Sequence, residues 1–163
     1  ALGEPQAALD CPREALFDRI GMASAVLETD ASGTFVGSSY LYATARDWAR
    51  FGQLLLQDGR WNGADVLPFG YVAWMRQAAP ASDGAYGRGH LWLHGPRATT
   101  PEGTHADAGF DLPGDAFWLL GHDGQTVTVV PSQDLVVVRL GLTPSKLGYK
   151  PQALVEALVE ALP

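Results

Sequence analysis

The second half of the sequence limits the fold most narrowly, because it holds three short apolar segments joined by tight connections. Residues 116–120, 126–130 and 135–140 are rich in β-branched and aromatic side chains, which is typical of strands. A turn at residues 131–134 makes the last two strands a hairpin. From Pro151 onward the apolar residues lie on one side of a helix. These segments predict an α+β fold, with an antiparallel sheet of about three strands covered by a C-terminal helix.

The last of these strands has an unusual pattern for a sheet with one solvated face. Residues 135–138 read Leu-Val-Val-Val, without polar alternation, so we expect burial on both faces. The C-terminal helix can cover one face only. The helices of residues 13–77, or polypeptide outside this sequence, must cover the other. A long apolar edge is also a liability unless something pairs with it.

The first half of the chain predicts helices. Residues 13–20 carry an apolar stripe, and Gly21 can end that helix in a left-handed conformation. The strongest helical pattern covers residues 45–57. Thr44 is placed to cap it, and Asp47 is placed to return its carboxylate to the cap N–H.

The order of these segments divides the chain into two parts. A further helix is expected over residues 68–77, a short strand over residues 90–94, and a loop over residues 97–115. We therefore predict a helical part in residues 1–86, and an antiparallel sheet with a C-terminal helix in residues 87–163.

Charge and hydropathy exclude two classes of partner. The 163 residues include 18 acidic and 11 basic side chains, for a formal charge of −7, which disfavours nucleic acid because a duplex binder must neutralise phosphates. No run of apolar residues is long enough to span a membrane. The single Cys11 allows no internal disulfide.

A nucleophile with an activating base is not evident from the sequence. No serine is followed three residues later by lysine, and none lies in a Gly-x-Ser-x-Gly motif. Cys11 has no neighbouring histidine or cysteine that would activate it.

Two histidine patterns suit metal binding, but neither is specific. His90 and His94 have the i, i+4 spacing of helical ligands, yet on the predicted strand they would lie about 13 Å apart. His105 and Asp107 form a short pair of a kind that is frequent by chance. We therefore predict no metal site and no cofactor.

The segment Gly-His-Asp-Gly-Gln at residues 121–125 follows an apolar strand and is the remaining candidate for chemistry. His122 at the sheet margin would be half exposed, with a protonation state able to change near neutral pH. The two glycines would let other backbone approach closely. The alternative is an ordinary turn with a solvated histidine.

Several blocks of the sequence resemble one family in the same order. The blocks are residues 16–22, 43–52, 112–118, 121–125 and 129–141. Together they resemble the C-terminal part of the serine β-lactamase and penicillin-binding-protein superfamily. They are most similar to the class-C-like esterases and the 6-aminohexanoate-dimer hydrolase group. The resemblance extends from about residue 12 to 162 and implies a partial β-lactamase-like fold, a fragment of one larger catalytic domain.

The resemblance also assigns roles to individual residues. The superfamily uses a Ser-x-x-Lys, a Tyr motif and a Lys/His-x-Gly motif, and His122-Asp123-Gly124 matches the third. It implies that His122 polarises the Tyr or holds the substrate, and that the N–H of Gln125 is one oxyanion-hole donor. Asp123 and Gly124 would line the substrate site. Tyr40 lies in a stretch that approaches the cleft in this group, so it is a candidate substrate contact, with packing as the alternative.

The first two motifs are absent, so the resemblance implies a C-terminal portion that is inactive alone. The parent would be a serine hydrolase that cleaves a small-molecule ester or amide through an acyl-enzyme, and histidine in place of lysine at residue 122 favours esterase or amidase chemistry. The missing N-terminal part, or a second copy, would pair with the strand at residues 135–140. Relatives are often exported to the periplasm or medium, but the residues do not indicate a compartment.

The same residues fit two other functions. A non-catalytic module could hold a peptide or a sugar in a cleft around His122 and Trp118. A plain interaction domain would instead bury residues 121–125.

Overall fold

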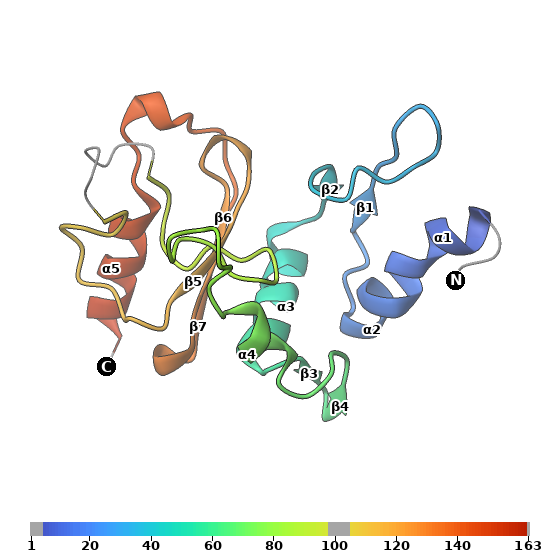
Figure 1. Ribbon diagram of the computed structural model, residues 1–163, viewed down its shortest axis with the longest axis horizontal. Helices are drawn as coiled ribbons and strands as arrows, with labels where there is room; N and C mark the ends of the chain where they lie inside the picture. The colour runs from blue at the N-terminus through green and yellow to red at the C-terminus, as the bar shows by residue number, and fades with distance from the viewer. Residues whose placement is uncertain (1–4, 98–104, 163) are drawn as a thin grey trace.

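The computed structural model describes residues 5–97 and 105–162, and its centre is a three-stranded antiparallel sheet (Figure 1). The strands are β5 (Phe117–Leu120), β6 (Thr126–Val130) and β7 (Leu135–Arg139), in that spatial order. Trp118 lies opposite Thr128, and Val129 opposite Val136. The predicted α+β fold with a C-terminal helix is confirmed.

The sheet lies between two helices, α3 (Ala45–Leu56) and α5 (Pro151–Ala161). Val129 packs in one apolar cluster with Leu55 of α3, whereas Val130 packs in another with Val155 of α5. Neighbouring residues of a strand point to opposite faces, so the two helices cover opposite faces. All five residues of β6 are buried, because α3 covers the face that the C-terminal helix cannot reach.

The contact between α3 and the sheet is unusually close at one position. A Cβ on Gly52 would lie 2.5 Å from Cγ1 of Val136 and 3.1 Å from Cγ1 of Val127. The helix can approach β6 and β7 to this distance only because Gly52 has no side chain.

The N-terminus of α3 has the predicted cap but a different carboxylate partner. The side chain of Thr44 accepts a hydrogen bond from the Asp47 N–H at 3.3 Å. The predicted return of the Asp47 carboxylate to the cap N–H is wrong. The carboxylate accepts hydrogen bonds from the N–H of Ser24 at 2.8 Å, from the Ser24 hydroxyl and from Arg50. Asp47 is buried, so these bonds attach α3 to the segment that follows Gly21.

The N-terminal helices start earlier than predicted. Helix α1 (Pro5–Pro12) continues through a π-helical turn (Arg13–Phe17) into α2 (Asp18–Ile20). Gly21 ends α2 with φ 73°, which confirms the predicted left-handed cap.

The helix expected at residues 68–77 is shorter, with α4 covering Tyr71–Met75. Gly70 directly before it has φ 75°, outside the helical region, so Pro68 cannot be its first residue. Two small ladders join β1 (Val26–Leu27) to β2 (Leu41–Tyr42), and β3 (Arg60–Trp61) to β4 (Ala64–Asp65).

The predicted strand at residues 90–94 is wrong. Trp92 alone forms a bridge to β5, with two backbone hydrogen bonds of 2.8 Å to Trp118. His90 has φ 60°, which turns the chain out of the extended conformation directly before the apolar residues.

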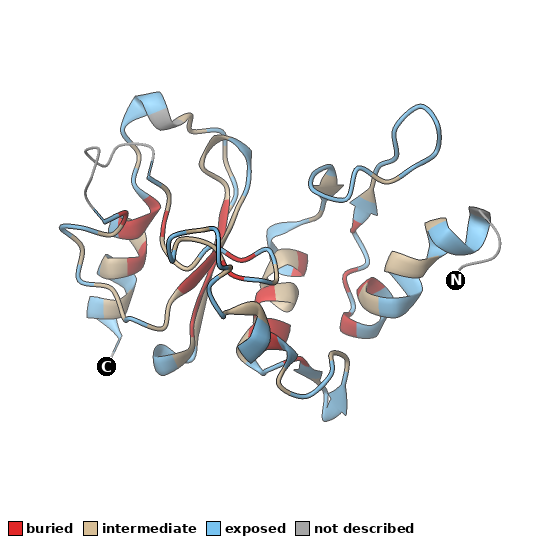
Figure 2. Cartoon of the chain, viewed as in Figure 1, coloured by how far each residue is buried: buried red, intermediate tan, exposed pale blue. Residues whose placement is uncertain are grey.

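Buried residues gather in the sheet and on the helix surfaces that face it (Figure 2). A separate apolar cluster joins Phe17 and Ile20 to Leu54 of α3. In the described part of the chain, Trp92 covers part of the outer edge of β5, whereas no strand pairs with the outer edge of β7. Among the helices of residues 5–97 and 105–162, none is long and apolar enough to cross a membrane.

Candidate functional site

The predicted site residues at 122–125 form a tight turn between β5 and β6. Asp123 has φ 53° and Gly124 has φ 80°, so two consecutive left-handed residues reverse the chain. The N–H of Gly121 donates to the Gln125 carbonyl at 2.8 Å and closes the turn. We call residues 121–125 the 121–125 turn.

His122 projects into solvent from this turn. Its side chain is 87% exposed, and its Nε2 lies 3.3 Å from Oδ2 of Asp123. The His122 carbonyl accepts hydrogen bonds from both amides of Gln125, the backbone N–H at 3.4 Å and Nε2 at 3.2 Å. The N–H predicted to stabilise an oxyanion is therefore engaged, through a long bond, within the turn itself.

Arg139, at the end of β7, holds the turn in place. Its guanidinium donates to the Gly124 carbonyl at 3.1 Å and to the Thr143 hydroxyl, and lies over the Tyr149 ring at 4.5 Å. The N–H of Thr143 donates in turn to the Asp123 carbonyl at 2.8 Å. Arg139 was not among the predicted site residues, although a lone arginine at the end of an apolar strand is a usable signal.

The structure does not bring Tyr40 to the 121–125 turn. Tyr40 has φ 65°, is 52% exposed, and precedes β2, which lies with β1 on the side of α3 away from the sheet (Figure 1). Within the described residues, it makes no hydrogen bond or ring contact with His122. Four of the five predicted site residues thus lie together, and Tyr40 lies apart.

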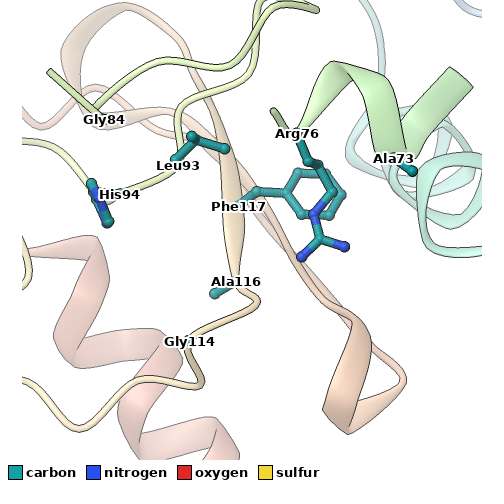
Figure 3. Close-up of a pocket in the computed structure, with 8 residues that line it drawn as sticks. All are labelled: Ala73, Arg76, Gly84, Leu93, His94, Gly114, Ala116 and Phe117. Carbon is teal, nitrogen blue, oxygen red and sulfur yellow. The ribbon is translucent and has the colours of Figure 1, made fainter. Parts of the chain in front are cut away.

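A pocket of about 380 Å³ lies elsewhere, against β5 (Figure 3). Its lining residues are Ala73, Arg76, Gly84, Leu93, His94, Gly114, Ala116 and Phe117. Arg76 donates to the Asp115 carbonyl at 2.9 Å and lies over the Phe117 ring at 5.0 Å. No predicted site residue lines this pocket. Sequence reasoning missed it because its walls come from α4, loops and β5.

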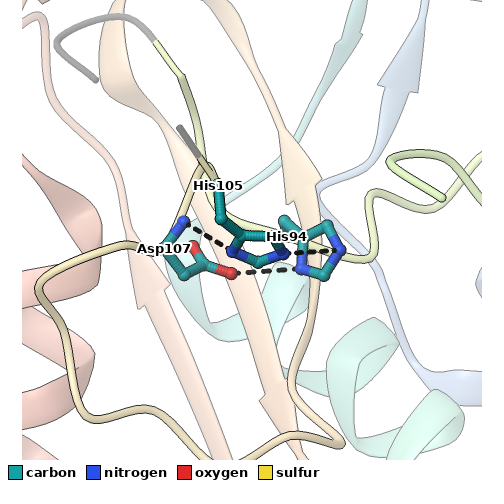
Figure 4. Close-up of side chains that lie close together, drawn as sticks. All are labelled: His94, His105 and Asp107. Carbon is teal, nitrogen blue, oxygen red and sulfur yellow. Dashed lines mark hydrogen bonds and ion pairs between the residues drawn. The ribbon is translucent and has the colours of Figure 1, made fainter. Parts of the chain in front are cut away.

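Three side chains considered only in separate pairs come together beside that pocket (Figure 4). His94 Nε2 lies 3.2 Å from His105 Nε2, and His94 Nδ1 lies 3.2 Å from Oδ2 of Asp107. His90 is not part of this group, since its Nδ1 lies 3.3 Å from the Tyr86 hydroxyl. We call His94, His105 and Asp107 the His–His–Asp cluster.

Two carboxyl groups outside the turn have lowered pKa values. The Ser24 hydroxyl, its N–H and Arg50 lower the pKa of Asp47 against the opposing effect of burial. Hydrogen bonds from the Ser32 hydroxyl, then the Thr34 N–H, lower the pKa of Asp30. Both carboxylates organise local structure and lie far along the chain from the 121–125 turn.

Comparison with known proteins identifies the fold. No profile of a known protein family matches the sequence. A Bacillus anthracis protein provisionally described as a 6-aminohexanoate-dimer hydrolase superposes with a TM-score of 0.61 and 28% identity, covering 91% of this chain. The chain has part of a β-lactamase-like fold. A Bacteroides dorei protein provisionally described as a β-lactamase shares it, with a TM-score of 0.54 over 91% of the chain and 17% identity.

The β-lactamase-like fold here corresponds to part of each relative. The chain covers 36% of the Bacillus anthracis protein and 49% of the Bacteroides dorei protein. An uncharacterized protein of Alkalihalophilus pseudofirmus is 28% identical over 102 residues, which are 61% of this chain and 29% of that protein. This chain therefore spans less than half the length of each relative, and its relation by fold is to hydrolases.

Proposed function

We propose that this chain is the C-terminal part of a serine hydrolase that cleaves a small-molecule ester or amide through an acyl-enzyme. The observation that carries the proposal is the superposition of 91% of the chain on a protein described as a hydrolase, at a TM-score of 0.61. The sequence contains no Ser-x-x-Lys, so in this proposal the nucleophile comes from polypeptide outside these 163 residues, and the chain alone is inactive.

The 121–125 turn would supply polar groups to the reaction. His122 is exposed and its imidazole is oriented by the neighbouring carboxylate of Asp123, which suits it to polarise a tyrosine hydroxyl or to hold a substrate. The Gln125 N–H makes only a long hydrogen bond to the His122 carbonyl, so it could donate to an oxyanion instead. Such an oxyanion-hole donor contributes about 3 kcal/mol of transition-state stabilisation. Asp123 and Gly124 would line the substrate site. Histidine in place of lysine at residue 122 favours esterase or amidase specificity.

Two features of the proposed enzyme need the rest of the protein. The outer edge of β7 is unpaired in the described residues and carries an apolar run, so we place a strand of the missing part there. Tyr40 would approach a substrate only from a surface completed by that part.

The test compares the chain alone with the chain joined to its complement. We expect the DNA upstream of this sequence to encode a Ser-x-x-Lys, and the joined protein to hydrolyse p-nitrophenyl esters. Serine→Ala in that motif should abolish turnover, and His122→Ala should lower kcat/KM by about 10- to 1000-fold. The chain alone should show no turnover above that of its own His122→Ala variant.

Two results would overturn the proposal. One is ester or nitrocefin hydrolysis by the chain alone that disappears in His122→Ala. The other is an upstream sequence without a Ser-x-x-Lys.

A binding module is the second candidate. Trp118 is fully buried, so it cannot line the cleft around His122 that the sequence predicted, and the pocket against β5 favours the module instead. The pocket combines the Arg76 guanidinium with the Phe117 ring, away from His122. Saturable binding of a peptide or sugar by the chain alone, lost in Arg76→Ala and kept in His122→Ala, would favour this function over the hydrolase.

A further inference from the structure

We propose that His94 and His105 bind a divalent late-transition-metal ion through their Nε2 atoms, with Asp107 as the residue that orients His94. This site is separate from the 121–125 turn and does not depend on the proposed hydrolase activity. The structure brings the three side chains together from two segments, and their ligand atoms all lie within 4.8 Å of one another (Figure 4).

The distance between the two imidazoles fits one shared ion. Nitrogens that bind tetrahedral Zn²⁺ at their usual distances lie about 3.3–3.4 Å from each other. The two Nε2 atoms lie 3.2 Å apart, and the rings meet at an interplanar angle of 73° with their centroids 4.0 Å apart. An ion can bind both Nε2 atoms at this separation once the rings turn so that both lone pairs converge on it, because two imidazoles on one tetrahedral ion have their centroids about 5 Å apart.

Asp107 is held in the position of a supporting carboxylate. Its Oδ1 accepts from the Gly95 N–H at 2.9 Å and from Gln152 at 3.4 Å. Gln152 is 2% exposed, and it also donates to the carbonyls of Pro96 and Ala106, so one buried amide links both segments of the cluster. The other oxygen, Oδ2, faces His94 Nδ1 at 3.2 Å. A carboxylate on the second nitrogen of a ligating histidine fixes its tautomer and increases its basicity.

The hydrogen bonds show which proton the ion would replace. The Asp107 N–H lies 3.2 Å from His105 Nδ1, so Nδ1 is the acceptor and the neutral ring carries its proton on Nε2. In that tautomer the Nε2–H of His105 lies beside His94 Nε2, and a proton on His94 Nδ1 lies beside Oδ2 of Asp107. On binding, the ion takes the place of the proton between the Nε2 atoms. His105 moves its proton to Nδ1, and the contact with the Asp107 N–H opens.

The donor set selects the class of ion. Imidazole nitrogens suit Zn²⁺, Ni²⁺ and Cu²⁺, whereas Mg²⁺ and Ca²⁺ prefer oxygen ligands. His94 is partly exposed and His105 is exposed, so an ion can enter from solvent, and the chain's formal charge of −7 attracts cations. His94 also lines the pocket against β5, which places the ion beside that pocket.

The experiment titrates the metal-free full chain with Zn²⁺ by calorimetry, in a Cys11→Ser background that removes the single thiol. We expect one ion per chain. His94→Ala and His105→Ala should each lower the affinity by at least about 100-fold, and Asp107→Asn by about 10- to 100-fold. The other two of the four histidines supply matched controls, so His90→Ala and His122→Ala should change the affinity less than 2-fold.

Folding is measured separately, because the Asp107 carboxylate also accepts a hydrogen bond from the Gly95 N–H and its loss could disturb the loop. Circular dichroism with excess chelator should show the same thermal transition for His105→Ala as for the parent, since His105 is exposed. Co²⁺ should give the intense visible bands of a tetrahedral site in the parent, and lose them in His105→Ala. The proposal is overturned if Zn²⁺ does not bind saturably, or if His105→Ala binds it as tightly as the parent.

Discussion

At the scale of single residues, buried or clamped polar side chains join segments that are distant in the sequence. Asp47 joins α3 to Ser24, and Arg139 joins β7 to the 121–125 turn. Each uses a charged group in several hydrogen bonds, and such bonds contribute about 1.5–3 kcal/mol each. Their loss should therefore be measurable even where little apolar surface is involved.

Asp47→Asn should destabilise the fold in a pH-dependent manner. The carboxyl pKa lies below its usual value of 3.8 because the folded state stabilises the carboxylate, chiefly through the Ser24 hydroxyl. That stabilisation is complete above the unfolded pKa and is lost as pH falls through the lower folded pKa. We expect Asp47→Asn to cost about 1–3 kcal/mol at pH 7, and the difference to shrink below pH ~4.

Urea unfolding from pH 3 to 7 measures this difference. Glu160→Gln removes an exposed carboxyl of α5 and should change the unfolding free energy by less than about 0.5 kcal/mol. A cost for Asp47→Asn that stays constant down to pH 3 would contradict the assignment.

Arg139→Gln should loosen the 121–125 turn, because the guanidinium bonds to Gly124 and Thr143 are lost together. We expect about 1–3 kcal/mol of destabilisation, and faster amide exchange at Thr143 than in the parent. Arg139→Lys keeps the charge but not the planar fork, so it should restore only part of the stability. Equal stability and unchanged exchange in Arg139→Gln would show that the turn does not depend on this residue.

At the scale of secondary-structure elements, the closeness of α3 to the sheet decides how the apolar strands are covered. Gly52 is unfavourable in a helix interior, yet it allows α3 to reach Val127 and Val136. The cost in helix propensity is offset by the close packing that buries β6 and partly covers β7 on this face.

Gly52→Ala tests which effect is larger. Helix propensity alone predicts a gain of about 1 kcal/mol, but the new Cβ would lie 2.5 Å from Val136 Cγ1, and overpacking costs about 1–3 kcal/mol. We expect net destabilisation. Val136→Ala makes room for the methyl group, so the double variant should be more stable than the sum of the single effects predicts. A more stable Gly52→Ala variant would show that the helix shifts freely.

At the scale of the whole molecule, the outer edge of β7 has no strand to pair with in the described residues. By contrast, β5 has part of its outer edge covered by Trp92. An apolar strand with free N–H and C=O groups pairs readily with another chain. Without its complement, the chain should therefore associate with a second copy.

Sedimentation at increasing concentration should show this self-association. Leu140, directly after β7, is 41% exposed, and Leu140→Lys should weaken association by about 10-fold because a charge at the edge opposes pairing. Leu162, which is 42% exposed and follows α5, supplies the matched control Leu162→Lys, which should have no such effect. A strictly monomeric parent chain would contradict the prediction.

Local signals in the sequence were sufficient to predict the main helices and strands. The Thr44 cap, the Gly21 terminator and the hairpin between β6 and β7 each depend on residues close together in the chain, so periodicity and turn chemistry predicted them. The strand expected at residues 90–94 was wrong because periodicity carries no information on the φ of 60° at His90.

Tertiary structure alone decided which polar groups meet. The Asp47 carboxylate bonds to Ser24 rather than to its own helix cap. His94 lies against His105 and Asp107 rather than pairing with His90. These partners belong to different segments, and their contact depends on how loops close over α3, α5 and the sheet. Sequence spacing describes neighbours along one element, whereas side chains from separate loops meet only once the core has placed both.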